Sequence, residues 1–169
     1  MTTAALEQKY QAMLREAEQR GVADVEGIRT CFQLLSLAAS IDRDCAALLA
    51  PHGLSEGRFV LLFLLQAAPD GLAPNLLAEQ AGVTRATVTG LLDGLEREGL
   101  AERHADAQDR RALQVRLTDK GQAVAELVFA QHGRWIAGLF ADLSGAERRQ
   151  LAGLLDKVAR GLAARRSAP

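Results

Sequence analysis

The chain has 169 residues, of which 49% are hydrophobic, 4% aromatic and 24% charged, and its formal net charge at pH 7 is −1. A nearly neutral balance argues against a generic polyanion binder, and no apolar run reaches the roughly 18 residues of a membrane span. The N-terminus lacks the layout of a signal peptide. We therefore expect a cytoplasmic, mainly α-helical protein of one domain.

The N-terminal 50 residues are predicted to form two helices. Thr3–Arg20 has the pattern of a weakly amphipathic helix, which either packs against the base of a dimer or forms a frayed tail. Asp24 then caps a long helix that runs from Val25 to about Ala50 and stops at Pro51. The apolar residues of this long helix cover too wide an arc for one buried stripe, so we expect part of them to meet a second subunit. The alternative is the central helix of a single globule.

The next predicted elements are two shorter helices. Ser55 caps the first of them, Glu56–Ala67, and residues 69–71 form a turn. Pro74 suits the first turn of the second helix, where its missing N–H costs nothing.

A helix-turn-helix follows. Small Ala78 is predicted to lie in its first helix, and Gly82 to lie in its turn, where a positive φ is required. Val88 and Leu91 then occupy the positions at which the second helix buries apolar side chains against the first.

The second helix of this motif has clear ends and two distinct faces. Thr84 is its predicted N-cap, and Gly99 lies at the expected left-handed C′ position. Apolar residues recur with helical spacing on the core face. The opposite face carries Ala86, Gly90, Asp93 and Arg97 and is flanked by Thr87 and Thr89, so its N-terminal half is made of small residues and threonines. Such a surface suits a recognition helix that enters the DNA major groove; the alternative is a solvated helix face.

A basic hairpin is predicted next. Ala101–Ala105 and Leu113–Leu117 are its strands, and the tip carries Arg110 and Arg111. Two adjacent arginines at a hairpin tip are long enough to enter a minor groove. Asp109 is expected to orient a neighbouring arginine, since a carboxylate is repelled by phosphates. The alternative is a charged surface hairpin.

Two long helices complete the chain. Thr118 is predicted to cap a helix that ends near Asp142, and Ser144 with Glu147 forms a capping box for a last helix that ends near Arg165. Together with the long N-terminal helix, these two helices are the predicted dimer interface.

The stretch Leu77–Gly121 resembles the DNA-binding core of the MarR family of bacterial regulators. The residues that carry the resemblance are LAEQAGVTRATVTGLLDGLEREGL and the later DAQDRRALQVRLTDKG. The resemblance implies a mainly α fold with a small β-hairpin wing. It also implies a homodimer that binds pseudo-palindromic double-stranded DNA as a repressor, with release by a small ligand or by oxidation. Residues 1–169 would then be one domain, with 1–50 and 119–169 as the helical dimerisation region and 54–118 as the winged helix-turn-helix.

By position, the resemblance assigns roles to individual residues. Major-groove contacts would come from Thr84, Arg85, Thr87, Thr89 and Gly90, and minor-groove contacts from Arg110 and Arg111. The chain differs from the family pattern at Gly90 and Gly94, where the family often has a basic or polar residue.

The resemblance also implies an effector pocket between the dimer helices and the winged domain. The candidate lining residues are His52, Arg58, Phe59 and Phe63, with Cys31 and Phe32 across from them. An arginine beside aromatic rings would suit an aromatic or lipophilic acid. For Arg58 taken alone, the favoured interpretation is a surface arginine. Cys31 is either an oxidation sensor or, given its apolar neighbours, an inert core thiol.

No motif for catalysis, a metal or a cofactor is visible. The three histidines are isolated, and the HExxH, CxxC and P-loop patterns do not occur. We therefore expect neither an enzyme nor a bound metal or cofactor. The alternative to a DNA-binding regulator is a winged-helix protein-interaction module that has lost DNA binding, an interpretation that the slightly acidic stretch 69–120 favours.

Overall fold

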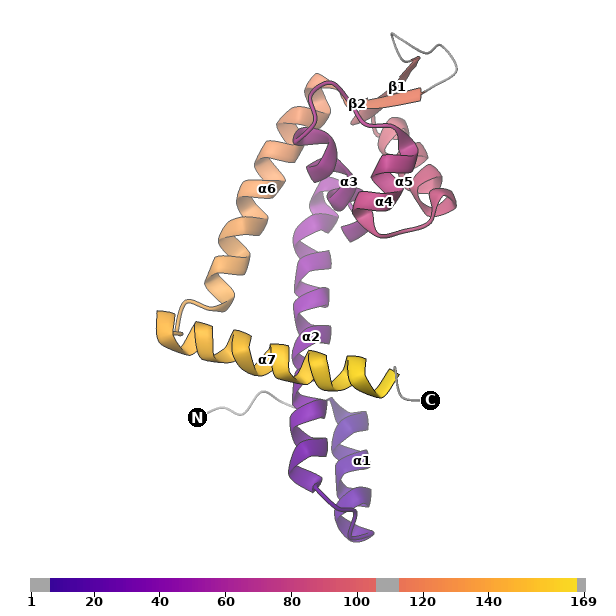
Figure 1. Ribbon diagram of the computed structural model, residues 1–169. Coiled ribbons are helices and arrows are strands. Elements are labelled where there is room, and N and C mark those ends of the chain that lie inside the picture. The colour runs from indigo at the N-terminus through magenta and orange to yellow at the C-terminus, as the bar shows by residue number, and fades with distance from the viewer. Residues whose placement is uncertain (1–6, 106–112, 167–169) are drawn as a thin grey trace. The chain divides into compact units, whose positions relative to one another are not determined.

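The computed structural model describes residues 7–105 and 113–166. The elements in chain order are α1 (Gln8–Gln19), α2 (Val25–Leu49), the 3-10 turn η1 (Ala50–His52), α3 (Glu56–Gln66), α4 (Pro74–Ala81), α5 (Arg85–Arg97), β1 (Ala101–Ala105), β2 (Leu113–Leu117), α6 (Asp119–Leu139) and α7 (Gly145–Arg166) (Figure 1). The chain divides into two compact units, residues 1–125 and 126–169, and α6 runs from the first into the second. The predicted fold class, mainly α-helical with one β-hairpin, is confirmed.

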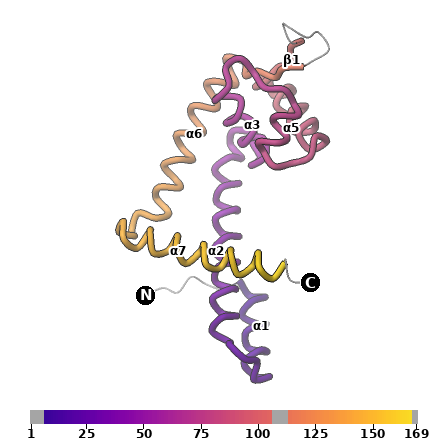
Figure 2. Tube along the Cα trace, in the orientation of Figure 1, coloured from indigo at the N-terminus to yellow at the C-terminus, as the bar shows by residue number. Residues whose placement is uncertain are grey.

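Helix α1 folds back along the first half of α2 (Figure 2). Leu14 is 4% exposed in this contact, and the ring of Tyr10 stacks on that of Phe32 with centroids 4.8 Å apart. An ion pair of 2.8 Å joins Glu18 to Arg29. Residues 8–19 of the predicted segment are thus a helix packed on α2 of the same chain, and residues 3–6 lie outside the described residues.

The core of the first unit lies among α3, α4, α5 and the hairpin. Its leucines and valines are at most 2% exposed: Leu61, Leu62, Leu65, Leu77, Val88, Leu92, Leu95 and Val115. These side chains come from the apolar stripes of three short helices and from the inner face of β2, so the hairpin is anchored to the same core as α5.

The hairpin has the predicted strands in antiparallel register, with Ala101 opposite Leu117 and Arg103 opposite Val115. An isolated bridge extends it, because Leu72 and Val115 exchange two backbone hydrogen bonds of 3.0 and 2.9 Å. The loop before α4 therefore holds the outer edge of β2, a contact that the sequence pattern did not predict.

The C-terminal unit contains the end of α6 and all of α7. The predicted capping box is present, since Ser144 N donates to Glu147 at 2.8 Å and Glu147 N donates to Ser144 Oγ at 3.3 Å. The hydrogen bonds that Ser144 donates lower the pKa of the Glu147 carboxyl. On α6, the Trp135 ring lies 5.4 Å from that of His132.

A membrane-spanning helix needs a long, predominantly apolar stretch of about 20 residues. No single helix within residues 7–105 and 113–166 is long and apolar enough to cross a bilayer. Only when the segments Val25–His52 and Glu56–Gln66, which are bent by 68° relative to each other, are taken together do they reach that length and apolar character.

Candidate nucleic-acid interface

Helix α5 is fixed at both ends by the residues that the sequence singled out. At its start, Thr84 Oγ1 accepts from Thr87 N at 3.1 Å, and Gly82 in the preceding turn has φ 66°. At its end, Gly99 has φ 68° and Leu100 N donates back to Leu95 O at 2.8 Å. The helix therefore presents a defined N-terminus, where the positive end of its dipole favours phosphate.

The predicted DNA-facing residues of α5 are all exposed: Thr84, Arg85, Ala86, Thr87, Thr89 and Gly90. An added Cβ at Gly90 would meet nothing within 4 Å, so this face is open. Three threonine hydroxyls are already oriented, because those of Thr84 and Thr87 share a hydrogen bond of 2.8 Å and that of Thr89 donates to Arg85 O at 3.0 Å. Fixed rotamers reduce the entropy lost when such side chains are ordered against base edges.

The hairpin is tied to α5 by Arg103 on β1. Its guanidinium pairs with Asp93 at 2.8 Å and with Glu96 at 2.5 Å, both on α5. These ion pairs fix the angle between the recognition helix and the stem of the wing, and they neutralise acidic charge on α5. The residues predicted for the wing tip, Asp109, Arg110 and Arg111, lie outside the described residues.

The end of α5 is also joined to the start of α6. Thr118 Oγ1 donates to Gly99 O at 2.7 Å, and Lys120 Nζ donates to Glu98 O at 2.6 Å, so two carbonyls at the helix end are satisfied. Gly121 packs against Leu100 so closely that an added Cβ would lie 2.8 Å from the Leu100 carbonyl carbon. The Leu-Thr-Asp-Lys-Gly exit of the wing thus joins the recognition helix to α6.

Gly94 does not belong to the DNA-facing surface. It is buried, and the guanidinium of Arg58 from α3 lies against it. Arg58 Nη1 also donates to Gly53 O at 3.1 Å. A basic or polar side chain at position 94 would thus point at Arg58 rather than at a phosphate.

The predicted effector residues do not come together within one chain. Phe32 stacks on Tyr10 of α1, and the unbroken helix from Cys31 to Leu49 spans about 27 Å at 1.5 Å per residue. The length of α2 thus holds Cys31 and Phe32 far from the other four candidates of the same chain, and the six-residue effector site stays a prediction.

The other candidates divide between the core and the surface. Phe59 is 9% exposed and belongs to the core, whereas Phe63 is 43% exposed. Phe63 lies five positions after Arg58, which places the two side chains about 140° apart around α3 at 100° per residue. His52 and Gly53 remain close to Arg58 in sequence, at the junction of α2 and α3.

The two cysteines differ in environment. Cys31 is exposed, but burial raises the pKa of the Cys45 thiol, and the charges of Glu56 and Asp42 raise it further. A raised pKa keeps Cys45 protonated at neutral pH, which is the opposite of the thiolate that a redox sensor needs. In the described part of the chain, no group of three or more histidines, cysteines or carboxylates is arranged to hold a metal ion.

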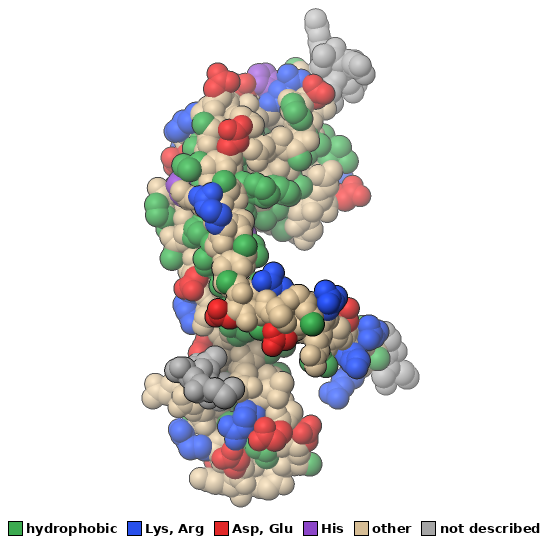
Figure 3. All heavy atoms as spheres, turned by 90° about the vertical axis from the view of Figure 1, so that its left-hand side faces the viewer, with side chains coloured by type: hydrophobic (Ala, Val, Ile, Leu, Met, Phe, Trp, Pro, Cys, Tyr) green, Lys and Arg blue, Asp and Glu red, His purple; other side chains and the backbone are tan. Residues whose placement is uncertain are grey.

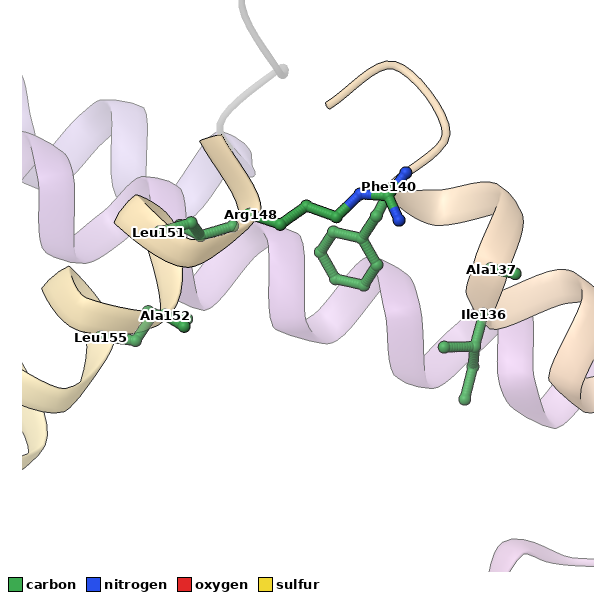
Figure 4. A pocket seen from close by; sticks show the side chains of 7 residues that line it. All are labelled: Ile136, Ala137, Phe140, Arg148, Leu151, Ala152 and Leu155. Atoms are coloured by element: carbon green, nitrogen blue, oxygen red, sulfur yellow. The ribbon is translucent and has the colours of Figure 1, made fainter. Parts of the chain in front are cut away.

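Two cavities are lined by residues other than those of the exposed face of α5. One of about 250 Å³ is lined by Glu56, Gly57, Val60, Ala81, Val83 and Leu91, behind the turn of the helix-turn-helix. The other, of about 330 Å³, lies at the α6–α7 corner, where Ile136 and Phe140 face Leu151 and Leu155 (Figure 4). Arg148 lies at its edge and donates from Nε to Leu143 O at 3.0 Å.

Known proteins are similar to this chain in sequence. The family model described as the MarR family matches residues 52–112. The HTH-type transcriptional repressor YetL of Bacillus subtilis (strain 168) is 33% identical over 141 residues, which cover 83% of this chain and 84% of YetL. The HTH-type transcriptional regulator PecS of Dickeya dadantii (strain 3937) is 28% identical over 146 residues, which cover 85% of this chain and 88% of PecS.

Solved structures share the fold. The S. aureus MepR–DNA complex superposes with a TM-score of 0.66 at 27% identity, covering 78% of this chain and 96% of MepR. Wild-type MarR from E. coli in its apo form superposes with a TM-score of 0.61 at 27% identity, covering 74% of this chain and 93% of MarR.

Proposed function

This chain belongs to the MarR family and is a DNA-binding transcriptional regulator, and we propose that it is a repressor that reads its operator with the exposed face of α5. The observation that carries the proposal is the open face around Gly90, flanked by the oriented hydroxyls of Thr87 and Thr89. The name of YetL supports repression. We place the protein in the cytoplasm, where DNA is accessible.

The proposed operator is pseudo-palindromic, because we propose that two copies of the chain bind it as a dimer. Arg85 on α5 would face the major groove, and Arg110 and Arg111 would reach the adjacent minor groove. A dimer doubles each of these contacts, which offsets the low net charge of the chain.

Substitution of Thr87 tests the proposal. The duplex that the wild-type protein selects from a random-sequence library is compared with a scrambled duplex of the same composition. We expect Thr87→Ala to lose about 1–3 kcal/mol of discrimination while binding to the scrambled duplex barely changes, since phosphates dominate that binding. Thr87→Val and Thr87→Ser separate the hydroxyl from the methyl contribution.

The same measurement at several salt concentrations tests the wing. Arg110→Ala and Arg111→Ala should each reduce the salt slope by about one unit for every phosphate interaction that the substitution removes. Equal discrimination by wild type and Thr87→Ala, with unchanged slopes for both wing variants, would contradict the proposed DNA interface.

We further propose that a small aromatic or lipophilic acid releases the DNA, and that it reaches Arg58 from the α2–α3 junction where His52 lies. Arg58 supports this because its guanidinium donates to a backbone carbonyl through Nη1, which leaves further donors for a carboxylate. Calorimetric titration with benzoate should show binding to the wild type and none to Arg58→Met. Arg15→Met, which removes an exposed charge on α1, is the control.

A further inference from the structure

The contact between Arg58 and Gly94 joins α3 to the recognition helix in an unusual way. The guanidinium lies against the Cα of Gly94, where an added Cβ would fall 2.5 Å from Cζ and from Nε of Arg58. Carbon atoms in favourable contact are about 3.5–4.0 Å apart. Only a glycine at position 94 therefore leaves room for the guanidinium in this place.

Both partners are unfavourable choices for local stability. Glycine inside a helix is less stable than alanine, and within residues 7–105 and 113–166 no carboxylate pairs with the half-buried Arg58, which donates instead to Gly53 O. Gly94 thus destabilises its helix, and Arg58 buries part of a charge without a carboxylate partner, yet the two residues fit each other closely. Such a combination indicates that the contact is required for function rather than for folding.

The position of the contact suggests what that requirement is. Gly94 lies one helical turn after Gly90, and residues four apart are neighbours on a helix surface. The guanidinium is thus one turn away from the open face that presents Thr87 and Thr89. It is also tied to Gly53, at the junction of α2 and α3.

We propose that Arg58 is a positioning residue for DNA reading: by lying on Gly94 while bonded to Gly53, it sets the depth and rotation of α5 relative to α3. This inference rests on the proposed role of the α5 face. It predicts that replacing the guanidinium alters the discrimination between DNA sequences, although Arg58 touches no base. Non-specific binding, which phosphates dominate, is retained.

A double-mutant cycle tests the proposal, using wild type, Arg58→Met, Gly94→Ala and the double variant. Each is measured with the selected and the scrambled duplex, at a temperature well below every melting point. Arg58→Met and Gly94→Ala should each reduce the ratio of the two affinities by about tenfold, within the range of couplings between contacting residues. The double variant should be no worse than Arg58→Met, because the added methyl then meets no guanidinium.

Melting temperatures supply a second readout. Gly94→Ala should raise the melting temperature of Arg58→Met by more than that of the wild type, since alanine favours the helix in both but displaces the flexible end of Arg58 only in the wild type. Gly90→Ala, where an added Cβ meets nothing within 4 Å, should raise it in both backgrounds. Arg15→Met is the control for loss of one positive charge and should leave discrimination unchanged.

Several outcomes would overturn the proposal. One is unchanged discrimination by Arg58→Met, a variant that adds no atoms near α5 and so tests the idea even if Gly94→Ala does not fold. Another is an equal loss from Gly94→Ala in both backgrounds. If the wild type selects no duplex, or if Thr87→Ala discriminates as well as wild type, the result contradicts the proposed DNA-reading face of α5, and the positioning role that rests on it falls as well. If Thr87 matters and Arg58 does not, only the positioning role fails.

Discussion

Gly121 illustrates how one residue type can be required by the approach of two backbones. An added Cβ would lie 2.8 Å from the Leu100 carbonyl carbon and nearer still to its oxygen. Backbone cannot move aside as the end of an arginine side chain can, so we expect Gly121→Ala to lower the free energy of unfolding by about 1–3 kcal/mol. Urea denaturation measures this change.

Gly90→Ala is the matched control for Gly121→Ala. It lies in open space and should gain about 0.5–1 kcal/mol from the better helix propensity of alanine. An unchanged unfolding midpoint for Gly121→Ala would show that the α5–α6 junction relaxes at no cost in free energy. The hydrogen bonds that Thr118 and Lys120 donate to carbonyls at the end of α5 argue against such a relaxation.

Single residues were predictable where their reason is local. Gly82, Thr84 and Gly99 mark a turn, a cap and a helix end, and each has the backbone or hydrogen bond that its sequence position indicates. Gly94 was not predictable, because its partner Arg58 lies far earlier in the chain and on another helix. The DNA contacts of individual residues stay predictions.

At the scale of elements, the ion pairs of Arg103 set the hairpin against α5. Glu96 is the more important partner, because its side chain is 29% exposed whereas that of Asp93 is 51% exposed and better screened by water. We expect Glu96→Gln to cost about 1 kcal/mol of stability and Asp93→Asn less, as exposed ion pairs contribute little. Hydrogen exchange of the β1 amides should accelerate in the same order, and an equal effect of both substitutions would contradict this ranking.

Most elements could be predicted from sequence because their ends carry local signals. Asp24, Ser55 and Ser144 each supply the capping bond expected at a helix start, and both strands have the predicted bounds. Contacts between elements were harder to predict from the sequence. The packing of α1 on α2 and the bridge at Leu72 depend on pairings between distant segments, which no periodicity encodes.

For the whole molecule, α7 is the strongest evidence for a second copy of the chain. None of its residues is buried, and its apolar side chains are 36–60% exposed: Leu151, Leu154, Leu155, Val158 and Leu162. Figure 3 shows hydrophobic side chains at the surface of one face, among charged groups of both signs. A helix gains most of its stability by packing an apolar face, so an uncovered α7 would be marginal in water.

We therefore predict a homodimer in which α6 and α7 contribute to an interface of roughly 2,000 Å² or more. Sedimentation velocity at micromolar concentration should show a dimer for the wild type and a smaller species for Leu154→Glu with Val158→Glu. Leu76→Glu, an exposed apolar position on α4, should remain dimeric. A wild type that sediments as a folded monomer would contradict this assembly.

The placement of Trp135 has a practical consequence for such experiments. It is the single tryptophan of the chain, it lies on α6 in the C-terminal unit, and its ring is next to that of His132. The tryptophan emission of the protein, excited at wavelengths where Tyr10 does not absorb, is thus a spectroscopic probe of that unit alone, with an ionisable ring beside the fluorophore. The helix-turn-helix contains no tryptophan. A change in tryptophan emission when DNA is added would therefore report that binding at the DNA-reading face alters the conformation or environment of the C-terminal half of α6.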